Sequence, residues 1–317
     1  MFSLPMISIV ENAAKEARTR ATVQRLLGIV LSAAALSACG ARSSLLDVDT
    51  WLDEERKQKD DAGGQGGPSV TPLDPAHDEV CGKALRGPLM VRIPLPDGGS
   101  FCIDSTEVSN RQYRAFLQAD YPRSQQPSYC AWNDSYVLPL TVPSPADNFP
   151  AVAVDWCDAR AYCAWAGKRL CGKIGGGHVS AGSPPYFDPV DALNEEWPYA
   201  CTAGGTRVYP YGDVYDKTGC VTFHYGITPI PADSTIGLRP IREAKKCEGG
   251  FPGLYDMGGN ASEWVDESDK ETGKNDIVLN FGAHFADSIY TKCIDRGSNT
   301  RDTPDGGVGI RCCKDGP

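Results

Sequence analysis

The sequence predicts an α+β domain with little regular secondary structure, held together by disulfides. Pro (24) and Gly (34) are spread along the 317 residues, a pattern that favours many loops and short elements. The chain has 13 cysteines, and removing Cys39 leaves an even set of twelve, from Cys81 to Cys313. An even set of this kind in an exported chain indicates a disulfide framework. The case for export comes from the N-terminus.

Residues 1–38 have the organisation of a secretory signal peptide. Arg18, Arg20 and Arg25 precede the uncharged stretch 26–36, and small residues follow it. The apolar stretch is too short for a membrane-spanning helix. Cys39 directly follows Leu-Ser-Ala, which resembles the lipobox of bacterial lipoproteins and implies cleavage before Cys39 and lipidation of its thiol. The alternative is an ordinary signal peptide that ends near a cysteine. Gly40 resembles the version sorted to the outer membrane, so we expect an exported protein anchored there by lipid, on either its periplasmic or its surface face.

Residues 39–80 form the next predicted segment, a flexible tether. They combine a charged stretch with a Gly-rich one and offer few apolar side chains to offset the cost of ordering. Residues 81–317 are then long enough for one large core. The formal net charge of −10 argues against nucleic acid as a partner and against electrostatic binding to anionic lipid. The membrane is expected as a partner only through the lipid on Cys39.

Local signals predict four elements at the start of this domain. Residues 90–94 and 100–104 are typical of two strands around the Pro-Asp-Gly-Gly turn at 96–99. Ser109 and Gln112 have the form of a capping box, which predicts a helix beginning there. Asp155 is a predicted N-cap for a second helix that ends at Gly167, where a left-handed residue is needed.

Several blocks together resemble the formylglycine-generating enzyme (sulfatase-modifying factor) family. The blocks are Pro-Ala-Val-Ala-Val-Asp-Trp-Cys and the helix that follows (150–170), Glu-Trp-Pro-Tyr-Ala-Cys (196–201), Tyr-Pro-Tyr-Gly (209–212), Gly-Leu-Tyr-Asp-Met-Gly-Gly-Asn-Ala-Ser-Glu-Trp (253–264) and Gly-Ile-Arg-Cys (309–312). They occur in the family's order and cover nearly all of residues 88–313. The resemblance implies a single α+β domain with the formylglycine-generating-enzyme fold, which is related to C-type lectins.

The resemblance also implies disulfides and a metal site. The family's bridges correspond here to Cys163–Cys312 and Cys201–Cys293, while the pairing of the other eight cysteines stays open. The family's calcium loop corresponds to residues 253–264. Carried over, the calcium ligands are the side chains of Asp256 and Glu263 and the carbonyls of Gly259 and Ala261, and oxygen ligands of this kind suit calcium. The alternative is a tight loop in which the two carboxylates cap backbone amides.

The chain departs from the family at the catalytic pocket. Formylglycine-generating enzymes oxidise a sulfatase cysteine with oxygen and hold copper(I) between two thiolates, a soft ligand pair that suits this ion. The interval for that pair is 282–292, and no cysteine occurs between Cys247 and Cys293. Ser262 replaces the family's active-site tryptophan, and Phe-Gly-Ala (281–283) replaces its Gly-Gly-Ser block. We therefore expect no copper and no catalytic residues.

These departures favour a non-catalytic binding or structural module of the cell envelope. The altered pocket of Ser262, His284 and Asp287 is the expected binding position, and a glycan or a peptide is the expected ligand. Trp132, Tyr136 and Tyr225 are candidate stacking surfaces for such a ligand, but ordinary packing is the preferred interpretation of each. The alternative function is an enzyme of the same family, either a formylglycine-generating oxidoreductase or a copper-independent tailoring enzyme acting on a periplasmic substrate.

Overall fold

A computed structural model of the chain describes residues 80–82, 85–137, 146–183, 186–188, 190–222, 225, 237–285 and 292–317. All of them belong to one compact unit, Thr71–Pro317. The expected signal peptide, the expected lipidation position Cys39 and all of the tether except Val80 lie outside the described residues.

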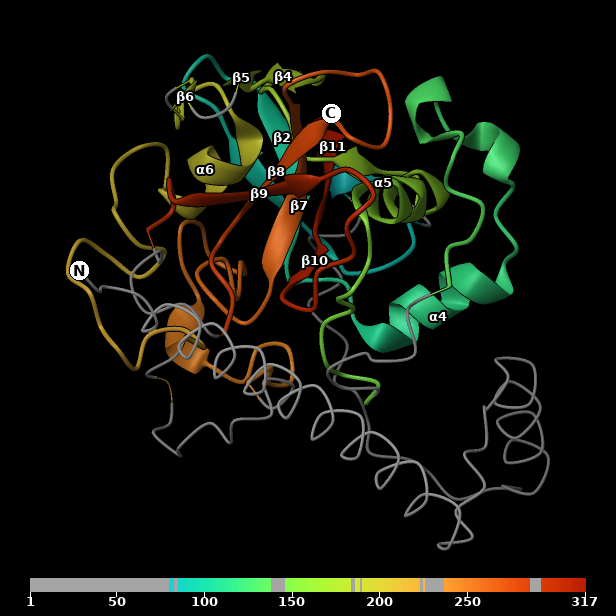
Figure 1. Cartoon of the computed structure of the whole chain (residues 1–317). Helices are drawn as coiled ribbons and strands as arrows, with labels where there is room; N and C mark the ends of the chain where they lie inside the picture. Colours follow the sequence, from blue (N-terminus) through green and yellow to red (C-terminus); the bar gives the residue numbers. More distant parts are fainter. Residues whose placement is uncertain are drawn as a thin grey trace, which may run out of the picture. The chain divides into compact units, whose positions relative to one another are not determined.

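Two of the sheets build most of the unit (Figure 1). The four-stranded sheet has the order β1-β2-β11-β3, and it contains β1 (Met90–Pro94), β2 (Ser100–Asp104), β3 (Arg169–Leu170) and β11 (Cys312–Asp315). The five-stranded sheet has the order β10-β7-β8-β9 with β4 also paired to β7, and it contains β4 (Val179–Ser180), β7 (Ser262–Ser268), β8 (Ile277–Phe281), β9 (Arg296–Thr300) and β10 (Val308–Ile310). A separate pair joins β5 (Gly182–Ser183) to β6 (Tyr186–Phe187).

The helices are short and are fixed by their caps. The described α-helices are α4 (Asn110–Gln118), α5 (Trp156–Trp165) and α6 (Glu196–Cys201), and the 3-10 turns are Arg123–Gln125, Ser128–Cys130 and Lys245–Cys247. Ser109 forms the capping box of α4 with Gln112, and Asp155 forms that of α5 with Asp158. These caps satisfy backbone amides that a helix start leaves without partners. The predicted strands at 90–94 and 100–104 and both predicted helix starts are confirmed.

Two large hydrophobic clusters lie against the sheets. The first joins α4 and α5 to the five-stranded sheet through Phe116, Tyr162 and Trp264, and Figure 1 shows these helices on the same side. Tyr136 belongs to this cluster, so the packing role preferred for it is the one it has. The second cluster joins α6 to both sheets, and there Trp197 stacks on Phe281 with ring centroids 5.2 Å apart.

Six disulfides use all twelve cysteines of residues 81–317. The pairs are Cys81–Cys102, Cys130–Cys157, Cys163–Cys312, Cys171–Cys313, Cys201–Cys293 and Cys220–Cys247. They include the two pairs that the family resemblance implied. The neighbouring Cys312 and Cys313 of β11 anchor that strand to α5 and to Cys171, which directly follows β3. The structure is thus the α+β, disulfide-stapled domain that the sequence predicts.

The disulfides also indicate an exported or otherwise oxidising environment, because cytosolic thiols are kept reduced. No helix within the described residues has the length and apolar character needed to cross a membrane.

Candidate functional site

The predicted calcium loop enters β7 through a sequence of unusual backbone conformations. Asp256 and Asn260 have φ of 61° and 64°, and Gly259 has φ of 147°. A Cβ on Gly259 would lie 2.4 Å from the carbonyl oxygen of Val221, so only glycine fits there. The Asn260 side chain accepts a hydrogen bond from the Arg239 amide (2.9 Å). The loop is therefore wedged between two other segments of the chain.

Two predicted ligands, Asp256 and Glu263, and a third carboxylate, Glu107, are buried around this loop. Oε2 of Glu263 accepts hydrogen bonds from Trp197 Nε1 (2.6 Å) and Arg311 Nε (2.7 Å). Oδ2 of Asp256 accepts from the Arg242 amide (2.6 Å). Capping of a backbone amide, the alternative to calcium, thus accounts for one oxygen of Asp256.

The second oxygen of each carboxylate has no hydrogen-bond partner. These atoms are Glu107 Oε2, Asp256 Oδ1 and Glu263 Oε1, and all are buried. Burial raises the pKa of Asp256 to about 6, against the opposing effects of the Arg242 amide and the Arg311 charge. Burial and the nearby Asp256 raise the pKa of Glu107 well above its usual value. Among the described residues these three carboxylates do not place one oxygen each within 4.8 Å of one another, so they do not form a three-carboxylate site. The two carried-over carboxylates, Asp256 and Glu263, each keep one buried oxygen that fits a cation preferring oxygen ligands, as calcium does.

Glu107 was missed by the sequence analysis. It directly precedes Val108 and the capping box of α4, whereas the loop lies about 150 residues later, and Asn260 joins the two by donating to Glu107 Oε1 (3.0 Å). The sequence shows only an acidic residue between Thr106 and Val108, and this does not indicate which loop the carboxylate meets.

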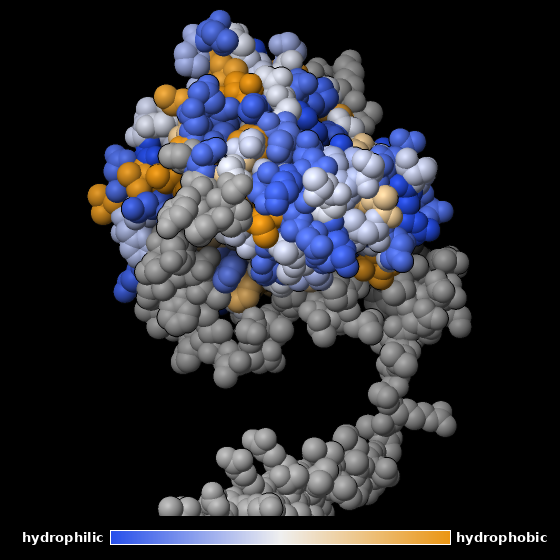
Figure 2. Space-filling view, turned by 45° about the horizontal axis from the view of Figure 1, so that its top comes forward, coloured by the Kyte–Doolittle hydropathy of each residue, from blue (hydrophilic) through white to orange (hydrophobic). Residues whose placement is uncertain are grey.

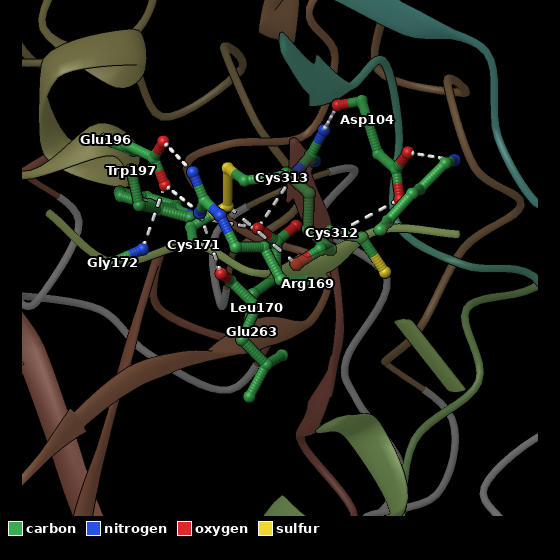
Figure 3. Close-up of a disulfide and its surroundings, with 12 residues drawn as sticks. Asp104, Arg169, Leu170, Cys171, Gly172, Glu196, Trp197, Glu263, Cys312 and Cys313 are labelled. Atoms are coloured by element: carbon green, nitrogen blue, oxygen red, sulfur yellow. Dashed lines mark hydrogen bonds and ion pairs between the residues drawn. A yellow bond between two sulfur atoms is a disulfide. The ribbon is translucent and has the colours of Figure 1, made fainter. Parts of the chain in front are cut away.

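The residues do not fit the family's copper ion. Among the described residues, one group of three Cys, His, Asp or Glu side chains has ligand atoms within 4.8 Å of one another: Cys171, Glu196 and Cys313. Its two sulfurs are bonded to each other (Figure 3). Glu196 in turn accepts from both terminal nitrogens of Arg169, at 2.6 Å each. This group is therefore a structural junction without a free thiolate.

The candidate pocket is a cavity of about 290 Å³ at one end of the five-stranded sheet. Ser262 and His284 both line it, so the structure brings these two predicted residues together. Asp287 lies outside the described residues. The other polar residues of the lining, all missed by the sequence analysis, are Asn280, Asp295, Arg296, Ser298, Asn299 and Asp305.

A second arrangement has the residue types of a hydrolase triad. Ser268 Oγ lies 3.5 Å from His178 Nε2, and His178 Nδ1 lies 3.3 Å from Asp266 Oδ1. The serine hydroxyl, however, donates to the carbonyl of Lys270 at 2.7 Å, and Ser268 is only 1% exposed. A nucleophile has to reach the substrate and transfer its proton to the histidine. These contacts therefore describe a structural link between β7 and the segment before β4.

Large exposed apolar side chains are few among the described residues: Val80, Val137, Leu193, Val208, Val214, Tyr215 and Ile294. In the view of Figure 2 the coloured surface is mostly hydrophilic, and its apolar patches are small and separate. Exposed apolar residues occur singly on most proteins and need no partner to explain them. The polar cavity is the better candidate for a binding site.

The fold, the buried carboxylate loop and the disulfide framework define a class of protein. The chain belongs to the sulfatase-modifying factor enzyme 1-like domain family, whose model matches residues 96–316. It is similar to the formylglycine-generating enzyme of Bos taurus, with 31% identity over 191 residues that cover 53% of this chain and 44% of the relative.

Other relatives match over a similar region. The formylglycine-generating enzyme of Streptomyces coelicolor is 30% identical, covering 53% of each chain. The protein named inactive C-alpha-formylglycine-generating enzyme 2 of Bos taurus is 30% identical, covering 52% of this chain and 50% of its own. The chain thus spans about half the length of the curated relatives it matches. Among solved structures, PvdO from Pseudomonas aeruginosa aligns with a TM-score of 0.44 at 19% identity, covering 72% of this chain and 94% of its own.

Proposed function

We propose that this chain is an exported, lipid-anchored protein whose family domain is a non-catalytic binding or structural module of the cell envelope. One observation carries the proposal: all twelve cysteines of residues 81–317 are joined in six disulfides. The copper(I) chemistry that the family resemblance implies needs two thiolates, and hard oxygen ligands do not replace them. No cysteine lies in the interval 282–292 where that pair would stand.

The similar proteins support the part of this proposal that concerns the domain. Formylglycine-generating enzymes among them support the family and its scaffold. One relative at the same level of identity is named an inactive enzyme, so similarity at this level does not by itself imply the activity. A binding module needs the scaffold of the family and does not need the thiolate pair, and this chain keeps the first and lacks the second.

The test compares free thiols with activity on the same preparation. Thiols of the full chain are counted under denaturant without reductant, and a Cys-x-Pro-x-Arg peptide is incubated with the chain, copper and oxygen. We expect no reactive thiol in residues 81–317 and no peptide oxidation, while an active formylglycine-generating enzyme serves as the positive control. Two reactive thiols together with peptide turnover would establish the alternative, a formylglycine-generating oxidoreductase.

The lipid anchor rests on Cys39 and is tested separately. Lipidation of one thiol adds buried acyl chains, which hold a protein at a membrane when more than one chain is present. The full chain is expected in the membrane fraction after high-salt washing, and the Cys39→Ser variant in the soluble fraction. Equal recovery of both in the soluble fraction would reject the anchor without affecting the proposal for the domain.

Calcium is proposed at the loop of residues 253–264. The side chains of Asp256 and Glu263 and the carbonyls of Gly259 and Ala261 would hold it, and Glu107 lies in the same buried cluster. The ion would neutralise carboxylate charge and fix the loop that leads into β7. Its role is structural.

A further inference from the structure

Two buried side chains of the polar cavity have no partner in the protein. Ser262 is 3% exposed and Asn280 is 5% exposed, and both line the cavity. Within the part of the chain that the structure describes, neither side chain makes a hydrogen bond. Neither residue contributes to the fully buried side-chain atoms that have no partner, so their polar atoms open into the cavity and are available there to water or to a polar ligand.

The surrounding backbone is built to leave room for the lining side chains. Gly297 on β9 lies opposite Asn280 on β8, and a Cβ there would be 2.7 Å from Asn280 Oδ1. A Cβ on Gly307 would be 2.7 Å from the ring of His284. Any other residue at either glycine would displace a lining side chain. The positions of Asn280 and His284 are therefore set by the fold.

The charges in the lining do not favour an anion. Arg296 Nη1 donates to Glu267 Oε1 (2.7 Å) and its Nη2 donates to the Asp188 carbonyl, so the guanidinium is engaged outside the cavity. Asp305 accepts from the Gly307 amide (2.8 Å) and from Asn299 Nδ2 (3.2 Å). Asp295 adds a second carboxylate to the lining.

We propose that this cavity binds one neutral saccharide unit. Its volume of about 290 Å³ is near the lower end of the range for small-molecule sites, about 300–1,000 Å³. Hydroxyl, amide and carboxylate groups around one small space match a ligand whose hydroxyls each donate and accept. A peptide side chain of apolar character would find only Ala283 and Val308 as apolar lining and would leave Ser262 and Asn280 unsatisfied. The inference rests on the proposed function, because it names the ligand class of the same pocket.

The experiment measures binding to the full chain by calorimetry and by saturation-transfer NMR. The probes are the methyl glycosides of glucose, galactose, mannose and N-acetylglucosamine, with sodium acetate and a tetra-alanine peptide as probes of the other classes. Asn280→Ala removes the buried amide. Ser298→Phe fills the cavity from its exposed rim and leaves the buried lining intact, so it serves if the first variant does not fold. Asn148→Ala, at an exposed asparagine outside the lining, is the matched control.

We expect at least one glycoside to bind saturably, with affinity lower by about tenfold or more in Asn280→Ala and in Ser298→Phe and unchanged in Asn148→Ala. Binding of no glycoside at millimolar concentration, binding of the peptide or acetate alone, or glycoside binding that survives Ser298→Phe would overturn the proposal. None of these binding results changes the expected thiol count or the expected result of the peptide-oxidation assay. Failure of this inference is thereby distinguishable from failure of the non-catalytic assignment.

Discussion

Glu263 shows how one residue connects the loop, the core and the C-terminal strand. Its carboxylate is fully buried between Trp197 of α6 and Arg311, which precedes β11. Arg311 extends the network by donating Nη1 to the Asp104 carbonyl (2.6 Å) and Nη2 to the Tyr255 carbonyl (2.7 Å). A buried ion pair with all these contacts is sensitive to loss of either partner, because the remaining charge stays in the core.

Arg311→Met is therefore expected to lower the free energy of unfolding by about 3–5 kcal/mol. Urea denaturation followed by tryptophan fluorescence measures the change. Lys246→Met, which removes the exposed Lys246–Asp216 pair, is the matched control and is expected to leave the midpoint within error. A loss in Arg311→Met no greater than that of the control would show that the network does not hold the core together.

The calcium ion proposed at the loop predicts a response of stability to chelation. Saturating calcium at about 100 times its dissociation constant stabilises a fold by about 2.7 kcal/mol. EGTA is expected to lower the Tm of the full chain, and added calcium to restore it. Asp256→Asn should remove most of this response, whereas Asp134→Asn, at an exposed position, should retain it. A Tm that EGTA does not change would leave amide capping as the role of Asp256.

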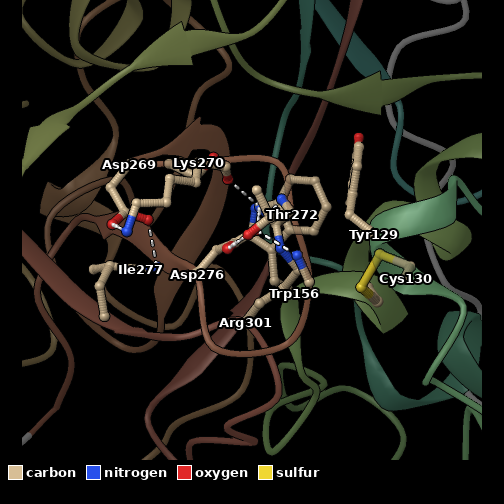
Figure 4. A network of polar contacts seen from close by, with 12 residues as sticks. Tyr129, Cys130, Trp156, Asp269, Lys270, Thr272, Asp276, Ile277 and Arg301 are labelled. Carbon is tan, nitrogen blue, oxygen red and sulfur yellow. Dashed lines mark hydrogen bonds and ion pairs between the residues drawn. A yellow bond between two sulfur atoms is a disulfide. The ribbon is translucent and has the colours of Figure 1, made fainter.

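At the scale of elements, the β7–β8 connection is fixed by a compact polar network (Figure 4). Asp276 accepts hydrogen bonds from the amides of Thr272 (2.6 Å) and Gly273 (2.8 Å). The guanidinium of Arg301 lies over the rings of Trp156 (4.3 Å) and Tyr129 (4.7 Å). Arg301 Nε and Nη1 have no hydrogen-bond partner, and the two ring faces provide their favourable contacts. Arg301 Nη2 donates to the carbonyl of Lys270 (2.9 Å), so Arg301 joins the connection to Trp156 at the start of α5.

The link from His178 to β7 makes a contribution to stability that depends on pH. Burial and, less strongly, the charge of Arg301 lower the pKa of His178. The hydrogen bond and charge of Asp266, together with the charge of Glu271, raise it. The raising effects are larger, so the pKa of His178 in the folded protein lies above its usual value. A raised pKa in the folded state means that protonation stabilises the fold. This contribution is complete below the unfolded pKa of about 6.5 and is lost as the pH rises through the folded value.

His178→Gln is accordingly expected to destabilise the fold more at pH 5.5 than at pH 8.5. Urea midpoints of the wild type and the variant at both pH values give the comparison. Asn148→Ala, at an exposed residue with no titratable group, is the control and should show no such difference between the two pH values. A pH-independent effect of His178→Gln would mean that the ring contributes only packing.

For the molecule as a whole, the sequence predicted what depends on neighbouring residues. The β1–β2 hairpin around residues 96–99 and the caps Ser109 and Asp155 follow from local turn and capping chemistry. The contact between Glu107 and Asn260 and the pairing of β10 beside β7 join distant segments, and no local signal encodes such contacts. The resemblance supplied two disulfides, but eight cysteines allow about 105 pairings, so the other four needed the structure.

The disulfides hold segments at very different separations, which predicts unequal contributions to stability. Cys163–Cys312 joins residues 149 apart, whereas Cys130–Cys157 joins residues 27 apart. In the chain-entropy model these loops correspond to about 5 and about 3.5 kcal/mol.

The double variant Cys163→Ala/Cys312→Ala should therefore lose more of the free energy of unfolding than Cys130→Ala/Cys157→Ala. Urea denaturation measures both, with mass mapping to verify the remaining five bridges. Because all four sulfurs are buried, cavity costs are similar in the two variants. An equal or smaller loss from the longer bridge would mean that native packing around the bridges, rather than constraint of the unfolded chain, decides their contribution.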